Sequence, residues 1–432
     1  MFLSLVIGYT VILSFPFWNY RNTPTYHPGK LVSLWYFFYT LPFLYVSLVN
    51  PPLVVHEYVL KQYYYQINDL LNEFVLTQSI GLVFLYLGIY SNIQFSRNEF
   101  ILNKFHLLRD TYDSKRIFSQ FYIFSIITFI FITYSLGGIN RILVGAYIDP
   151  EFMSGTGHLI ALLDSCIYIS AISYSNLISN SKTNSIVTLL VFISYFIMLA
   201  IFGGRSSFIL LILTAYFSYT IYGGKTFKLN WKNTLAIVAI FLYLIVAPTI
   251  RGNTQKDVID FKEVIQSNFI NLAKGNEYVS IQLSILGHFD ISNIWMGKSY
   301  LDLAYAIIPS AIYENKPPIE EGLYFFNIVK GYSVTPPFPS RMMQPVGWPP
   351  GTHGILFANF HVFGLCLGYY ILGLFYRYLY HHVELNSNKA TLLMLYFFVI
   401  FKFELTNHWI FHLITFTVTL RVISTMHRFI RK

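Results

Sequence analysis

Three arginines have the residue type and the sequence setting for binding an anion. Arg205 follows Gly203 and Gly204 at an expected helix start, Arg251 follows an expected membrane-spanning segment, and Arg341 lies in a proline-rich stretch. Glycines let a ligand approach the backbone closely, and a guanidinium group binds phosphate oxygens in a bidentate way. We expect the three side chains to bind a lipid pyrophosphate if the fold brings them together. For Arg205 the alternative is a side chain that extends to the lipid headgroups.

A histidine and an aspartate are further candidates. His353 stands at the start of an expected span, and a histidine there is a candidate general base because its pKa lies near neutral. His361 is a weaker candidate, and either residue could serve only as a hydrogen-bonding group. Asp164 lies about seven residues inside another span, where an acid is costly and marks a candidate site. Asp164 could equally pair with Arg205.

Signals for metals and cofactors are weak. His408 and His412 have the i, i+4 spacing of two ligands on one helix face, but no zincin glutamate follows and no third ligand is evident. Lys402 and Glu404 are interpreted as a structural pair. Both cysteines fall in apolar runs, and no phosphate-binding loop or dinucleotide fingerprint occurs. The sequence therefore predicts neither a metal site nor a cofactor.

Composition places these residues in a membrane protein. Of 432 residues, 55% are hydrophobic and 11% charged, and the mean hydropathy is +0.52. A soluble domain normally carries about a quarter charged residues, so lipid must be most of this chain's surroundings. The net charge of +9 is distributed as in a membrane protein, and no nucleic-acid partner is expected.

The elements that position these residues are membrane-spanning helices, each of about 20 apolar residues. We predict an all-α polytopic protein with about eleven spans and one large loop that contains short helices. The expected spans are 1–18, 31–49, 74–95, 117–136, 157–178, 186–202, 207–222, 234–250, 354–376, 391–403 and 409–425.

The distribution of basic residues predicts the orientation. One set of alternate connections holds 16 Lys and Arg residues, whereas the short connections of the other set hold three. The basic side is expected to be cytoplasmic. The N-terminus and the loop 251–353 would then face the periplasm or the cell exterior. The predicted division is an N-terminal bundle over 1–250, the loop over 251–353, and a C-terminal bundle over 354–432.

The loop is the expected place of chemistry, since it holds nine of the chain's 17 prolines. Its segment 300–309 is too short to span and is interpreted as an amphipathic helix at the interface or in a cavity. Its aromatic residues could stack on sugar rings or form the loop's own core. They are Trp295, Tyr313, Tyr324, Phe325, Phe326, Tyr332, Phe338 and Trp348.

Three segments resemble the Wzy-type polymerases that join oligosaccharide repeat units in bacterial inner membranes. They are the Gly-Gly-Arg-Ser-Ser element over 203–207, the segment 299–318 with its Ile-Pro and Lys-Pro pairs, and the glycine- and aromatic-rich segment 351–379. The expected topology also agrees with that family. Two departures are the Asn359 that stands where the family often has an acid, and the nine rather than ten residues between Arg341 and Gly351.

The resemblance implies a GT-C-like glycosyltransferase that needs no cofactor. The growing glycan would leave undecaprenyl pyrophosphate for a new repeat unit carried by the same lipid, at the periplasmic face of the cytoplasmic membrane. Such a transfer needs cations for the departing pyrophosphate and a base for the acceptor proton. The residues implied are Arg205, Arg251, Arg341, Lys316 and Asp164 for substrate binding, and His353, Arg341, Glu320 and Glu321 for catalysis.

Other functions stay open on the sequence. An O-antigen ligase would share the topology and the donor. Another polyprenyl-linked-sugar glycosyltransferase would need a metal-linked acid, for which Glu57 and Asp69 in the first outer connection are the candidates. A flippase or transporter would be expected to show internal symmetry. Interpretation of the chain as a polymerase implies three partners: membrane lipids, the lipid-linked oligosaccharide and a chain-length-regulating co-polymerase.

Overall fold

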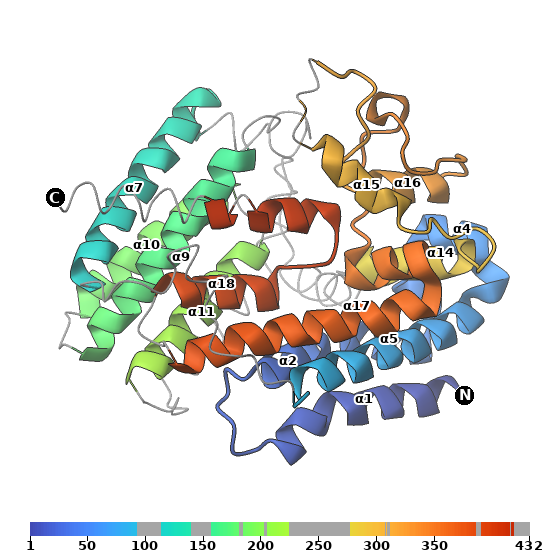
Figure 1. Cartoon of the computed structure of the whole chain (residues 1–432), viewed down its shortest axis with the longest axis horizontal. Helices are drawn as coiled ribbons and strands as arrows, with labels where there is room; N and C mark the ends of the chain where they lie inside the picture. Colours follow the sequence, from blue (N-terminus) through green and yellow to red (C-terminus); the bar gives the residue numbers. More distant parts are fainter. Residues whose placement is uncertain are drawn as a thin grey trace, which may run out of the picture. The chain divides into compact units, whose positions relative to one another are not determined.

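A computed structural model gives the fold (Figure 1). It describes residues 1–92, 114–139, 157–180, 185–202, 205–223, 277–306, 308, 312–385, 390–414 and 416–418. Within these ranges every regular element is a helix, so the expectation of an all-α chain is confirmed there. The expected span 234–250 and the candidate Arg251 lie outside the described residues.

Five helical segments in the described ranges are long and apolar enough to cross a membrane. They are Phe2–Asn19, Pro28–Val49, Glu57–Ile89, Ser114–Ser135 and Gly351–Leu385. Shorter apolar helices cover Ile186–Leu199, Leu210–Gly223 and Ala390–Phe401. These segments indicate a membrane protein, and the total of about eleven spans stays a prediction.

The chain forms two compact units. The first comprises Met1–Gln94, Val258–Tyr378 and Ile400–Phe411, and the second comprises Phe95–Asp257, Leu379–Val399 and His412–Lys432. The predicted division at 250 and 353 follows membrane topology instead, and it too stays a prediction.

In the first unit, α5 (Ile67–Ile89) lies beside α17 (Gly351–Leu385), which belongs to this unit as far as Tyr378, and α1 (Phe2–Asn19) packs on α5 (Figure 1). Gly88 and Gly373 face each other where the two backbones touch, and a Cβ on either would meet the partner's backbone. Small residues allow such close packing between membrane helices. The next helices are α2 (Pro28–Tyr39) and α3 (Leu41–Val49), which divide the expected span 31–49 at Thr40.

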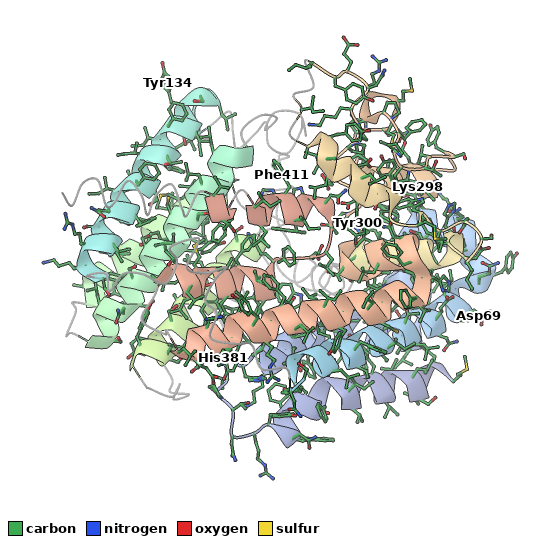
Figure 2. The ribbon with its side chains drawn as sticks, viewed as in Figure 1. Asp69, Tyr134, Lys298, Tyr300, His381 and Phe411 are labelled. Atoms are coloured by element: carbon green, nitrogen blue, oxygen red, sulfur yellow. The ribbon has the colours of Figure 1, made fainter. Side chains whose placement is uncertain are left out.

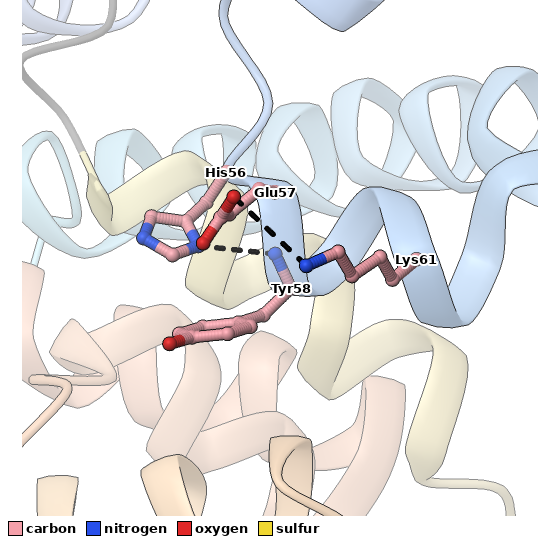
Figure 3. A network of polar contacts seen from close by, with 4 residues as sticks. All are labelled: His56, Glu57, Tyr58 and Lys61. Carbon is pink, nitrogen blue, oxygen red and sulfur yellow. Dashed lines mark hydrogen bonds and ion pairs between the residues drawn. The ribbon is translucent and has the colours of Figure 1, made fainter.

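The connection over 50–66, between α3 and α5, is also part of this unit. Its short helix α4 (Glu57–Tyr63) is capped by His56, whose Nδ1 accepts a hydrogen bond from the Tyr58 amide at 3.3 Å (Figure 3). Glu57 forms an exposed ion pair with Lys61 at 4.0 Å. The ammonium of Lys330, in the large loop, lies 3.4 Å from the centre of the Tyr58 ring. This connection is therefore packed against the large loop.

The described part of the large loop folds as α14 (Glu277–His288), α15 (Lys298–Tyr305), α16 (Gly322–Val329) and η4 (Ser340–Met342). Five of its eight aromatic candidates are buried and form its core, whereas Tyr313 and Tyr332 are exposed. Burial of one large apolar side chain stabilises a fold by about 1.5–3 kcal/mol. The buried five, Trp295, Tyr324, Phe325, Phe326 and Trp348, therefore serve the loop's stability.

The second unit contains α7 (Ser114–Ser135), α9 (Gly157–Asn180), α10 (Ser185–Phe202), α11 (Arg205–Gly223) and most of α18 (Ala390–Phe401). Hydroxyl groups join its helices: Ser170 Oγ lies 2.6 Å from Tyr195 Oη, and Tyr122 Oη lies 2.9 Å from Ser194 Oγ. Apolar side chains such as Ile127 on α7 remain exposed, as expected for a surface in lipid.

Candidate functional site

A cavity of about 80 Å³ lies inside the first unit. Membrane helices α2, α5 and α17 supply most of its wall, the loop helix α14 contributes Tyr278, and the segment Ile400–Glu404 completes it. The polar groups that face it are a carboxyl, an ammonium, a threonine hydroxyl and four phenols. They belong to Glu404, Lys402, Thr352, Tyr36, Tyr278, Tyr369 and Tyr376.

Glu404 reaches this cavity because the chain leaves helical conformation after α18. Helix ends at Phe401 and resumes over 407–414, so several backbone groups in between lose their helical partners. Non-helical backbone among membrane helices is tolerated where protein buries it or where it lines a cavity. Both conditions hold for this break, because Lys402 and Glu404 line the cavity and Thr406 is buried.

Side chains of the loop and of α17 satisfy the backbone at this break. The Leu405 amide donates to Thr352 Oγ1 at 3.0 Å, and the Tyr300 hydroxyl donates to the Leu405 carbonyl at 2.9 Å. The Asn407 amide donates to Glu321 Oε1 at 2.7 Å. In Figure 2, Tyr300 on α15 lies beside the segment that contains Phe411. The loop thus fixes the backbone on the C-terminal side of Glu404.

Glu321 is one of the acids that the sequence put forward, and it is buried at the start of α16. Burial raises its pKa to about 8, with smaller contributions in the same direction from the nearby carboxyls of Asp302 and Glu320. Glu320 is half-buried against Gly347, and burial raises its pKa as well. Glu321 therefore stays protonated near neutral pH while its Oε1 holds the Asn407 amide.

Asp302 is a buried acid that sequence reasoning missed. It lies on α15, where Ser299 and Asp302 point inward and Leu301 is exposed, the reverse of a helix that buries its apolar face. The Tyr324 hydroxyl donates to Asp302 Oδ2 at 2.8 Å, and burial raises the pKa of Asp302 to about 6. The signal available in the sequence was an acid inside an apolar segment.

A second break interrupts α17. His361 has φ 54° and ψ −148°, which is not a helical conformation. The carbonyls of Ala358 and Asn359 therefore lose the backbone amides that would bond to them one turn later in a continuous helix. These carbonyls accept hydrogen bonds instead from the amides of Trp295 and Met296, at 2.9 and 3.0 Å. The loop segment after α14 is docked into this break.

Asn359, noted above as a departure from the pattern of the Wzy-type polymerases, is fully buried beside this second break. Its Nδ2 donates to Ser299 Oγ at 2.8 Å and to the Ile355 carbonyl at 2.9 Å. The Ser299 carbonyl in turn accepts from Asn407 Nδ2 at 2.6 Å. This chain of contacts links the two breaks through α15.

The structure places His353 in the interior between three helices, away from the cavity lining. Its Nδ1 lies 2.9 Å from Gln282 Oε1, and its Nε2 lies 3.0 Å from Thr77 Oγ1. Both nitrogens are therefore engaged, and the residue is fully buried. In this arrangement His353 joins α5, α14 and α17, and its role as a base stays a prediction.

The basic candidates of the loop are held by local contacts. Arg341 is exposed and forms an ion pair with Glu314 at 3.0 Å. Lys316 donates to the carbonyls of Ala306 and Ile308 at 3.1 and 2.8 Å, and burial lowers the pKa of its ammonium. Lys316 therefore closes a turn of the loop, whereas an exposed pair such as that of Arg341 can exchange its partner at little cost.

The remaining candidates belong to the second unit. Arg205 begins α11, and its side chain lies outside what the structure describes. Asp164 lies on α9 one turn before Tyr168, whose hydroxyl donates to the Ser207 carbonyl at 3.1 Å. Asp164 is therefore near the start of α11, as a partnership with Arg205 requires. Convergence of the three arginines stays a prediction.

Within the described ranges, no group of three His, Cys, Asp or Glu side chains is placed to hold a metal ion. Comparison of the chain with protein-family models, with curated proteins and with solved structures gives no match. The candidate site is therefore defined by its own geometry: a polar cavity among apolar helices, with one carboxyl presented by a helix break and a folded loop that fixes that break.

Proposed function

We propose that this protein is a membrane glycosyltransferase that polymerises oligosaccharide repeat units carried on undecaprenyl pyrophosphate. The observation that carries the proposal is the cavity that contains Glu404, where apolar helices meet a folded loop. A lipid-linked glycan has an apolar tail and a hydroxyl-rich head, so its enzyme needs both surroundings at one place. Phenol and carboxyl groups are suitable partners for sugar hydroxyls.

The reaction fits these surroundings without an added cofactor. A hydroxyl oxygen of the acceptor repeat unit would attack the anomeric carbon of the donor glycan, and the bond from that carbon to the pyrophosphate oxygen would break. Undecaprenyl pyrophosphate would leave with the electron pair, and its negative charge would be stabilised by Arg205, Arg251 and Arg341. The acceptor proton would pass to a base. The site would face the periplasm, and the membrane would be the bacterial cytoplasmic membrane.

Deletion of the gene in its host tests this proposal, with surface polysaccharide separated by electrophoresis. Loss of the long ladder, with core plus one repeat unit retained, supports the polymerase. Bare core lipid, with undecaprenyl-linked polymer accumulating in the membrane, would instead identify a ligase. Re-expression of the intact chain must restore the ladder for either result to count.

The two helix breaks favour a second candidate, a transporter of lipid-linked oligosaccharide, because transporters often present interrupted helices to their cargo. The docking of the loop into both breaks argues for a fixed arrangement instead. The same deletion strain separates the two functions. A transporter's loss would leave single repeat units on the cytoplasmic face, inaccessible to a glycosidase added outside spheroplasts, whereas a polymerase's loss would leave them accessible.

A further inference from the structure

The carboxyl of Glu404 is the one acidic group among the residues that line the cavity. Within the described part of the chain, no hydrogen bond to this carboxyl is formed, whereas Glu321 and Asp302 both accept one. The hydroxyl groups of Tyr36 and Tyr376 are close enough to interact electrostatically with it. A carboxyl with free acceptor capacity in a polar cavity is open to a ligand hydroxyl.

The position of this carboxyl is fixed. On its C-terminal side, the Leu405 and Asn407 amides are held by Thr352 and Glu321, and on its N-terminal side Phe403 is buried against Phe375. Such support keeps a reacting group within reach of its substrate. None of these anchors uses the Glu404 side chain itself.

The protonation of Glu404 also suits proton transfer. Glu404 lies in the connection after α18, and burial raises its pKa to about 7. A general base works best when its pKa lies near the working pH. The other titratable groups that face the cavity are Lys402 and the phenols of Tyr36, Tyr278, Tyr369 and Tyr376.

The size of the cavity limits what it can hold. Pockets for whole drug-sized ligands have volumes of about 300–1,000 Å³, and this cavity has about 80 Å³. It therefore accommodates the edge of one sugar and excludes an oligosaccharide. An acceptor meets this limit, because only its terminal non-reducing sugar has to enter.

We propose that this cavity receives the non-reducing end of the acceptor repeat unit and that Glu404 takes the proton from the attacking hydroxyl. The assignment rests on the proposed function and adds the acceptor subsite and its base. The hydroxyl O–H bond breaks, its oxygen forms the new bond to the anomeric carbon, and the proton ends on Glu404. The departing pyrophosphate keeps the electrons of the bond that it leaves.

The test uses the full-length protein in nanodiscs. The probe is the lipid-linked repeat unit extracted from the deletion strain, and polymer formation is followed between pH 5 and 9. The wild type should show a rise in rate with an apparent pKa near neutral. Glu404→Gln should lower the rate by about 10²–10⁴-fold and abolish that rise, because amide nitrogen cannot accept the proton. Glu404→Asp should recover part of the rate.

Glu384→Gln is the matched control, since Glu384 is an exposed acid outside the cavity lining. It should polymerise as the wild type does. Thermal unfolding of Glu404→Gln near the wild-type temperature would show that a lost rate reflects chemistry. A Glu404→Gln variant that keeps the wild-type rate and pH profile overturns the assignment.

A second measurement separates this inference from the proposed function. The difference infrared spectrum between wild type and Glu404→Gln isolates the protonated carboxyl band of Glu404. That band should shift when the lipid-linked repeat unit is added, because an acceptor hydroxyl would bond to the carboxyl. A shift without any polymer formation would keep the subsite and reject the polymerase. An unmoved band in a protein that makes polymer would reject the subsite and keep the polymerase.

Discussion

The two helix breaks of the first unit differ in what satisfies them and in what they present. At His361 the freed carbonyls of α17 accept backbone amides of Trp295 and Met296. After α18 the freed groups of Leu405 and Asn407 bond to side chains, and Glu404 beside them faces the cavity. The first break joins the loop to a helix, whereas the second presents a carboxyl to a site.

The two breaks should therefore differ in their sensitivity to side-chain substitutions. Backbone contacts such as those at His361 survive most side-chain replacements, since they need only the peptide groups. Contacts made by Thr352, Tyr300 and Glu321 disappear when the side chain is replaced. The break after α18 should therefore be sensitive to single substitutions in both stability and activity, and the break in α17 should be tolerant.

The largest effect is expected from Glu321→Ala. It leaves the buried Asn407 amide without its acceptor, which costs about 1–3 kcal/mol, and it opens a cavity that adds to the loss. The melting temperature and polymer formation should both fall, because the backbone next to Glu404 is released. Thermal unfolding in detergent measures the first effect, with the exposed Glu314→Ala as the control. Unfolding of Glu321→Ala at the wild-type temperature would contradict the comparison.

The pH dependence of stability should be the next largest effect. Burial raises the pKa of Glu321 to about 8 and that of Asp302 to about 6, whereas unfolded carboxyls titrate near 4. At these two carboxyls the folded state thus binds more protons than the unfolded state between about pH 4 and 8, and their contribution to stability falls as pH rises through that range. The melting temperature should decrease from pH 7 to pH 8, above the range in which His288, whose pKa burial lowers, has the opposite effect. Glu321→Gln should flatten this decrease, and an unchanged slope in that variant would show that Glu321 is not its source.

Sequence patterns predicted several of the long apolar helices and missed their interruptions. Apolar length predicted α1, α7 and α17 because a membrane imposes it, and those helices are among the five long apolar segments. The break at His361 has no proline, and one glycine, Gly364, lies three residues later, where a Cβ would meet the Leu356 carbonyl oxygen. The break also depends on docking of a segment about 65 residues earlier in the chain, and a single glycine inside an apolar span does not predict such a contact.

The candidate site was likewise predictable from the sequence only in part. Glu320 and Glu321 were identifiable as acids in a large loop, and Glu321 lies near both Glu320 and Asp302. Glu404 was interpreted as half of a pair with Lys402, since two opposite charges at a helix end usually indicate one. Its presentation to a cavity depends on Thr352, Tyr300 and Glu321, which come from three separate elements, and only the fold brings them together.

Thr352→Val should have a smaller effect than Glu321→Ala. The substitution keeps the side-chain shape and removes the hydroxyl that accepts the Leu405 amide. One buried amide donor is then left without an acceptor, which lowers the free energy of unfolding by about 1–3 kcal/mol. Thr352→Ser keeps the acceptor and should stay close to the wild type in melting temperature and in polymer formation. A valine variant that unfolds at the wild-type temperature and forms polymer at the wild-type rate would mean that this hydrogen bond does not support the break.

The smallest effect is expected at His361, where removal of the Cβ should raise the free energy of unfolding rather than lower it. Its φ of 54° with ψ of −148° lies in a region that a Cβ disfavours and that glycine adopts freely. His361→Gly should therefore be more stable than His361→Ala by about 1 kcal/mol. In an ordinary helix interior the order is reversed, because alanine is favoured over glycine by about 0.5–1 kcal/mol. Comparing the two variants by thermal unfolding isolates the Cβ, since both remove the imidazole. If the alanine variant is the more stable, α17 is continuous in the folded protein, and the contrast between a structural break and a functional one disappears.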